Sequence, residues 1–169
     1  RPMPALLMIL IVKHVNNING DKIMSQFQDD IKKFNGIYKL PVAVTPTLKS
    51  VGDPVARLVA FKDILSEELD EIDEVIALVN SAKSEDTTTI ALTALADLLG
   101  DIQVYCASEM AKFGLPLDKV LGIIMQSNFS KLGADGLPIY DERGKVQKGP
   151  GYYRPEPEIK KALLEIKDI

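Results

Sequence analysis

Residues 53–80 read DPVARLVAFKDILSEELDEIDEVIALVN, and this stretch decides the fold. Asp53 is a typical N-cap residue, and Pro54 suits the first turn of a helix. Apolar residues then recur at every third or fourth position as far as Val79, which is the period of an α-helix. The stripe expected to face the core is centred on Leu65, Leu69, Ile72 and Ile76. The stretch therefore predicts one long helix.

The same periodicity predicts an all-α fold. Further helices are expected from Met24 to Tyr38, from Asp86 or Thr87 to Phe113, from Pro116 to Gly133 and from Pro157 to Ile166. The second of these carries an apolar stripe made of Ala91, Leu95, Leu98, Ile102 and Tyr105. Turn signals at Asp135-Gly136 and Arg143-Gly144 predict a small hairpin or structured loop before the last helix. The two longest helices are expected to pair antiparallel.

The composition excludes several kinds of chemistry. The chain holds one histidine, His14, one cysteine, Cys106, and no tryptophan. These are too few for a zinc site of His and Cys ligands, a disulfide framework or a Ser/His/Asp relay. If the protein is an enzyme, carboxylates are the expected catalytic groups. A net charge of −4 argues against a nucleic-acid partner, and the single cysteine fits a cytoplasmic protein.

Residues 1–21 are interpreted as an N-terminal arm or extension ahead of a domain at residues 22–169. The run from Ala5 to Val12 is strongly apolar but holds only eight residues. A membrane-spanning helix needs roughly 20. We expect a strand or a docking arm in this run rather than a targeting segment, and no membrane partner.

The acidic residues of the 53–80 helix fall into two groups on a helical wheel. The outward group is expected to be solvated and consists of Asp63, Glu67, Asp70 and Glu74. Glu68 and Glu71 instead lie beside the core stripe, where carboxylates would lose solvent and repel each other. On the next helix Asp97 and Asp101 lie beside the Leu98 stripe in the same way.

If the two helices bury neighbouring stripes, Glu68, Glu71, Asp97 and Asp101 come together. Four half-buried carboxylates are difficult to hold without divalent cations, and oxygen ligands of this kind suit Mg²⁺, with Mn²⁺ as a substitute. The alternatives are a cationic partner such as Arg57 or Lys62, or raised carboxylate pKa values. A di-iron site is excluded because its Glu-x-x-His ligands need more than one histidine.

A second set of polar residues follows the 116–133 helix. Asn128 lies in line with Leu121 and Met125, so an amide ends an apolar stripe. A run of cations comes next, namely Lys131, Arg143, Lys145, Lys148 and Arg154. Glycines among these cations would let backbone amides approach a phosphate. Carboxylates, a metal and a cationic arm are together what a triphosphate requires.

Three segments resemble a known enzyme superfamily, the all-α nucleoside triphosphate pyrophosphohydrolases, which includes MazG-like proteins, dimeric dUTPases and phosphoribosyl-ATP pyrophosphohydrolases. SEELDE, residues 66–71, resembles the EExxE helix, and ADLLGDIQVY, residues 96–105, resembles the second acidic helix in a DxxxD form. SNFSKL, residues 127–132, with KVQKGPGY, residues 145–152, resembles a subgroup with an SN-x-SK motif.

The resemblance implies a four-helix-bundle-like, MazG-type unit with a small irregular or hairpin C-terminal segment, assembled as a dimer or tetramer. It also implies Mg²⁺-dependent cleavage between the α and β phosphates of a nucleotide, giving a monophosphate and pyrophosphate, in nucleotide-pool cleaning. The metal ligands carried over are Glu67, Glu68, Glu71, Asp97 and Asp101. The substrate-binding residues carried over are Asn128, Lys131, Lys145, Lys148 and Tyr152.

The expected mechanism is attack by water on phosphorus, with Glu68 or Glu71 accepting the proton. Two alternatives stay open. One is the phosphoribosyl-ATP pyrophosphohydrolase of histidine biosynthesis, which has the same chemistry and another substrate. The other is a non-enzymatic helical dimer that binds a basic partner through the outward acids.

Overall fold

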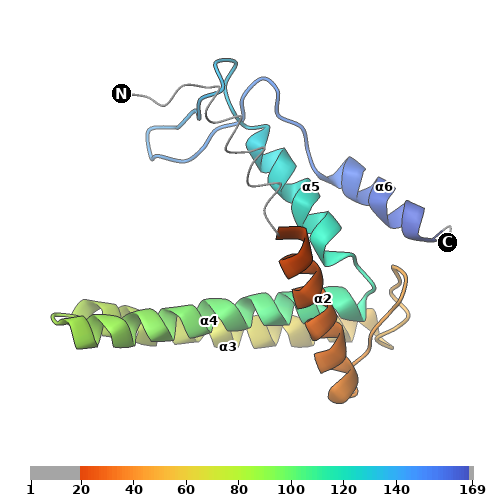
Figure 1. Cartoon of the computed structure of the whole chain (residues 1–169), viewed down its shortest axis with the longest axis horizontal. Helices are drawn as coiled ribbons and strands as arrows, with labels where there is room; N and C mark the ends of the chain where they lie inside the picture. Colours follow the sequence, from red (N-terminus) through yellow and green to blue (C-terminus); the bar gives the residue numbers. More distant parts are fainter. Residues whose placement is uncertain (1–19, 168–169) are drawn as a thin grey trace. The chain divides into compact units, whose positions relative to one another are not determined.

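The fold is all-α, as predicted. The computed structural model describes residues 20–167 (Figure 1). The run Ala5 to Val12, His14 and nearly all of the predicted N-terminal arm lie outside these residues. Within them the helices are α2 (Gly20–Ile37), α3 (Pro54–Ser81), α4 (Glu85–Lys112), α5 (Leu117–Phe129) and α6 (Glu156–Lys167), and there is no strand.

The chain divides into two compact units. One consists of Ile31–Leu115 and holds the last two turns of α2 with all of α3 and α4. The other consists of Arg1–Asp30 with Pro116–Ile169, and its described part holds the start of α2 with α5 and α6. The predicted acids belong to the first unit and the predicted cations to the second.

The long helices begin at side-chain caps. Asp53 is the N-cap of α3 and accepts hydrogen bonds from the backbone N–H groups of Val55 and Ala56, at 2.9 and 3.2 Å. The predicted cap of α4, Asp86 or Thr87, is wrong by a few residues. Ser84 is the N-cap, and Thr87 completes a capping box with it. Both residues can accept a backbone hydrogen bond, and the reciprocal pair favours the earlier start.

The end of α4 is closed by a left-handed glycine. Gly114 has a φ of +67°, and a Cβ at this position would lie 2.3 Å from the carbonyl oxygen of Thr45. The N–H groups of Gly114 and Leu115 bond back to the carbonyls of Ala111 and Met110, which is a Schellman motif. The extended segment 40–50 satisfies further carbonyls of this end, including that of Phe113 through Thr47 N–H.

α3 and α4 lie antiparallel, side by side along their lengths (Figure 1). The stripe predicted on α4 faces its partner, since Ala91 and Leu98 are buried. The stripe predicted on α3 is wrong: Leu69 is 58% exposed and Ile76 50%. α3 meets α4 through the neighbouring face, which carries the buried Glu68 and Val75.

α3 therefore carries apolar residues on two faces, and α4 covers only one of them. α4 also carries more apolar residues than its contact with α3 buries. By length and composition it is a candidate membrane span, the one such helix in the described part of the chain, and 17% of its most apolar window is buried. A helix that buries apolar residues on two of its faces has the same apolar composition as a candidate membrane span.

In the other unit α5 packs against α6. α5 ends at Phe129, four residues before the predicted Gly133, because the N–H groups of Lys131 and Leu132 bond back only three residues. The predicted hairpin is present: Tyr140 and Val146 form an antiparallel bridge, and Gly144 has a φ of +77° in its turn. Of the predicted inner stripe of α5, Leu117 is buried and Ile124 half-buried, but Leu121 and Met125 are 37% and 48% exposed.

Candidate active site

Glu68 is a buried carboxylate inside a helix pair. Its residue is 7% exposed, and it lies between buried or half-buried apolar residues on the face of α3 that meets α4. Its Oε2 atom is buried and has no hydrogen-bond partner in the described chain. An unpaired buried carboxylate oxygen is energetically unfavourable unless another group or ion satisfies it.

Other carboxylates surround Glu68. Burial raises the pKa of Glu68 most, and the negative charges of Glu71, Asp101 and Glu67 raise it further. A side-chain hydrogen bond from Tyr105 acts in the opposite direction and lowers it. The sequence prediction that Glu68 and Asp101 approach each other across the two helices agrees with this coupling. The arrangement therefore disfavours the charged form of Glu68 when no cation is bound.

No lysine or arginine among residues 26–166 forms an ion pair with Glu68. The sequence offered Arg57 or Lys62 as structural partners, but Arg57 forms its ion pair with Glu109 instead. The ion pairs among residues 26–166 are Arg57–Glu109, Lys112–Glu109 and Lys119–Glu165. The alternative of raised carboxylate pKa values holds for Glu68 in the structure without a metal.

The other predicted ligands are more exposed than expected. Glu71, Asp97 and Asp101 are all solvent-exposed in the single chain, not half-buried, because the helix pair covers only the face centred on Glu68 and Leu98. Glu67 is exposed, as predicted. Asp97 is not among the groups that shift the pKa of Glu68, and it lies in a shallow depression of α4 with Thr89, Leu92, Thr93 and Ala96.

The chemistry of these carboxylates suits a hard divalent cation. Their positions match a cation site only in part. Carboxylate oxygens are the ligands that Mg²⁺ prefers, and the unsatisfied Oε2 of Glu68 is a free ligand atom. Within the described residues, no three carboxylates stand close enough to hold a metal ion together. Exposed Glu71 and Asp101 have rotamer freedom to turn toward Glu68. A cation would thus be held by Glu68 with Asp101, and Glu71 would lie beside it.

Tyr105 is a site residue that the sequence reasoning assigned only to the apolar stripe. It is half-buried on α4, near enough to Glu68 for each group to shift the pKa of the other. Burial and the charges of Glu68 and Asp101 raise the pKa of the Tyr105 hydroxyl, so it stays protonated. The sequence could have predicted this placement. Tyr105 follows Asp101 by four residues, and residues one helical turn apart share a face.

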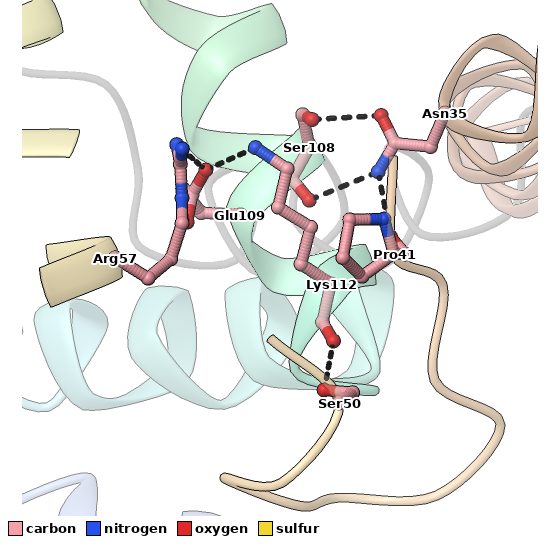
Figure 2. Close-up of polar contacts among 7 residues, drawn as sticks. All are labelled: Asn35, Pro41, Ser50, Arg57, Ser108, Glu109 and Lys112. Carbon is pink, nitrogen blue, oxygen red and sulfur yellow. Dashed lines mark hydrogen bonds and ion pairs between the residues drawn. The ribbon is translucent and has the colours of Figure 1, made fainter. Parts of the chain in front are cut away.

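A buried polar network fixes the end of α4 in the same unit (Figure 2). Arg57 of α3 and Lys112 both pair with Glu109, and Lys112 and Glu109 are each more than nine-tenths buried. Asn35 of α2 is fully buried and bonds to Ser108. These contacts attach the start of α3 and the end of α2 to the last turns of α4, and so set the register in which Glu68 meets Tyr105.

The predicted substrate residues lie around the end of α5 and the loop that follows. Asn128 is exposed rather than the buried end of a stripe, and its Oδ1 accepts a hydrogen bond from Lys131 Nζ at 2.7 Å. Lys148 Nζ lies 4.6 Å from the ring centre of Tyr152, a cation–π distance. Lys145 is exposed, and its backbone N–H bonds to Asp141. None of these lysines forms an ion pair with a described residue.

The loop bearing these cations depends on one glycine. Gly149 N–H donates to the carbonyl of Lys131 at 2.9 Å. A Cβ on Gly149 would lie 1.9 Å from the carbonyl oxygen of Leu132, so only glycine permits this approach. The contact returns the chain to the end of α5 and places residues 145–152 beside the SNFSKL segment.

Comparisons with known proteins give little. No protein-family model and no curated protein matches the chain. Among solved structures, a chain from Exiguobacterium sp. 255-15, titled "putative NTP pyrophosphohydrolase", is 24% identical. The match covers 84% of this chain and 96% of that one, with a TM-score of 0.43.

Proposed function

We propose that the protein is a Mg²⁺-dependent nucleoside triphosphate pyrophosphohydrolase that cleaves between the α and β phosphates. One observation supports this most: Glu68 is a buried carboxylate with an unsatisfied oxygen and three acidic neighbours, and no described cation pairs with it. If the acids of α3 only formed a solvated face, Glu68 would be exposed rather than buried. The likeness of residues 66–71, 96–105 and 127–132 to the superfamily motifs supports the same assignment.

The α3–α4 acids have different roles in this proposal. Glu68 and Asp101 hold the cation, with Glu67 and Asp97 at the edge of the set. Glu71 is exposed one turn after Glu68, so it can reach a water molecule and accept its proton. Mg²⁺, when bound, supplies positive charge to the phosphate oxygens. The hydroxyl of Tyr105 orients Glu68 by occupying part of its carboxylate.

The cations around α5 are proposed to contact the nucleotide. Lys131 and Lys148 are held by Asn128 and the ring of Tyr152, contacts that orient the ammonium groups without neutralising them. Exposed Lys145 completes the set. Ammonium groups of this kind neutralise phosphate charge that remains after cation binding.

A homo-oligomer, dimer or tetramer, is part of the proposal. The apolar face of α3 that α4 leaves uncovered includes Leu69, Ile72, Ile76 and Val79, all exposed. A continuous apolar face on a long helix is typical of an interface. Light scattering is expected to give a mass of at least two chains, and Ile76→Glu is expected to reduce it to one chain.

A substrate screen tests the function directly. Nucleoside triphosphates and phosphoribosyl-ATP are incubated with the protein in Mg²⁺ or in EDTA, and pyrophosphate and orthophosphate are measured separately. Pyrophosphate and a monophosphate in equal amounts, only with Mg²⁺, are the expected products. Orthophosphate as the direct product would reject cleavage at the α–β bond. Release from phosphoribosyl-ATP alone would select the biosynthetic alternative over pool cleaning.

A further inference from the structure

A groove on the α5–α6 unit has the side chains of a ligand site. Its volume is about 490 Å³, within the range of small-molecule sites. It runs between α5, residues 153–154 and the first turn of α6, and it is lined by Ile123, Gln126, Tyr153, Arg154, Pro157 and Glu158. Apart from Arg154, the last cation of the run that follows α5, none of these residues belongs to the sets assigned to metal or phosphate binding above.

Two hydroxyl groups of α5 fix one wall of the groove. Ser127 is 3% exposed, and its Oγ donates to the carbonyl of Tyr153 at 2.8 Å. The N–H of Tyr153 donates to Ser130 Oγ at 3.2 Å, and this hydroxyl in turn donates to the carbonyl of Ser127. Both backbone polar groups of Tyr153 are therefore held, while the residue stays 43% exposed. A wall ordered before binding loses little entropy when a ligand binds.

The lining side chains point to a flat, polar and anionic ligand. Tyr153 offers an aromatic face, and Ile123 and Pro157 offer apolar contact, which suits a planar ring. Arg154 forms no ion pair with any described residue, so it is available for a phosphate. Glu158 likewise forms no ion pair with a described residue, so its carboxylate can accept two parallel hydrogen bonds.

We propose that this groove binds a guanine nucleotide. Guanine carries two adjacent N–H donors, on the ring and on the exocyclic amine, which match the two oxygens of Glu158. Uracil offers one N–H between two carbonyl oxygens, which a carboxylate repels. Gln126 can donate to the carbonyl oxygen of guanine, and Arg154 binds the phosphate. This binding goes beyond the proposed hydrolysis, because it needs neither the α3–α4 acids nor a metal.

Calorimetric titration of the full chain with GMP, UMP and inorganic phosphate, in EDTA, tests the proposal. GMP is expected to bind at least about tenfold more tightly than UMP, since two charge-assisted hydrogen bonds distinguish the bases. Glu158→Gln is expected to remove this preference, and Arg154→Gln to weaken both nucleotides. Glu156→Gln, on the same helix turn but outside the groove, is the matched control and is expected to change nothing.

Several results would overturn the proposal: no GMP binding, equal affinity for GMP and UMP, or a GMP preference that survives Glu158→Gln. Phosphate binding as tight as GMP binding would also reject it, because the base would then contribute nothing. Because the titration excludes Mg²⁺ and measures no turnover, its failure is separate from a failure of pyrophosphate release. Circular dichroism of each variant, all at exposed positions, confirms that the helices are intact.

Discussion

Asn35 and Ser108 exchange two hydrogen bonds in the interior. Ser108 Oγ donates to Oδ1 of Asn35 at 2.7 Å, and Nδ2 of Asn35 donates to the carbonyl of Ser108 at 3.3 Å (Figure 2). Asn35 is fully buried, so water cannot replace either partner. The pair joins the last turns of α2 and α4 beside the Arg57–Glu109–Lys112 cluster.

Removing the Asn35 side chain is expected to destabilise the protein. Asn35→Ala leaves the buried Ser108 hydroxyl without its acceptor and opens a small cavity, so the free energy of unfolding should fall by about 2–3 kcal/mol. Urea denaturation measures the change. Ser66→Ala is the control, because that exposed hydroxyl bonds only to its own helix and its loss should change stability by less than about 0.5 kcal/mol. A change for Asn35→Ala as small as the control's contradicts this account.

Lys112 and Lys119 make a matched pair of ion-pair tests. Lys112→Met leaves Glu109 buried with one cation fewer, and is expected to lower the free energy of unfolding by about 3 kcal/mol. Lys119→Met breaks the exposed pair with Glu165, and should change it by less than about 1 kcal/mol. Thermal or urea unfolding compares the two variants. Equal effects would mean that the Glu109 cluster is not the buried network described.

Glu68 is expected to destabilise the protein when no metal is present. Its pKa in the folded chain is raised above the usual 4.5, so the fold disfavours the charged form. The stabilising contribution of the neutral form is complete below pH 4.5 and is lost as the pH rises through the raised pKa. Glu68→Gln should therefore raise the melting temperature at pH 7 in EDTA.

Adding Mg²⁺ should reverse this order. Mg²⁺ should raise the melting temperature of the wild type, because a ligand that binds only the folded state stabilises it, and should leave the Gln variant unchanged. Lower melting of Glu68→Gln in EDTA, or an equal Mg²⁺ response in both proteins, would contradict the assigned role of Glu68.

Tyr105 is expected to act on metal affinity through Glu68. Tyr105→Phe keeps the ring and removes the hydroxyl that lowers the pKa of Glu68. The Mg²⁺ concentration for half-maximal thermal stabilisation and for half-maximal activity should both rise about tenfold, as for other groups that orient a metal ligand. Tyr140→Phe, at an exposed hairpin position, is the control. An unchanged Mg²⁺ requirement would leave Tyr105 as a packing residue only.

Local signals in the sequence predicted the helices well. Asp53, Pro54 and the apolar period located α3 to within a residue, because caps and periodicity act within a few residues of the chain. The turn at Gly144 was predictable for the same reason. The N-cap of α4 was predicted a few residues too late. Ser84, Asp86 and Thr87 can all cap a helix, and only the capping box distinguishes them.

The packing between helices was less predictable from the sequence. α3 has two apolar faces, and periodicity alone does not say which of them meets α4; the structure selects the face with Glu68 rather than that with Leu69. The same limit explains why the exposure of Asn128 and the nearness of Tyr105 to Glu68 were not predicted. The nearness of Glu68 and Asp101 was predictable in part, because both were placed beside the stripes that meet and the antiparallel order was inferred. The roles of the acids and of the cations stay predictions.

The most direct test of the central claim compares Glu68→Gln with Asp70→Asn in Mg²⁺-dependent pyrophosphate release. Both substitutions remove one negative charge from the same helix, but Asp70 is exposed and is not among the groups that shift the pKa of Glu68. Glu68→Gln is expected to lower kcat/KM on the order of 100-fold or more, and Asp70→Asn less than about twofold. Equal activity of the two variants, or a larger loss in Asp70→Asn, would contradict the claim and favour binding of a basic partner by the outward acids.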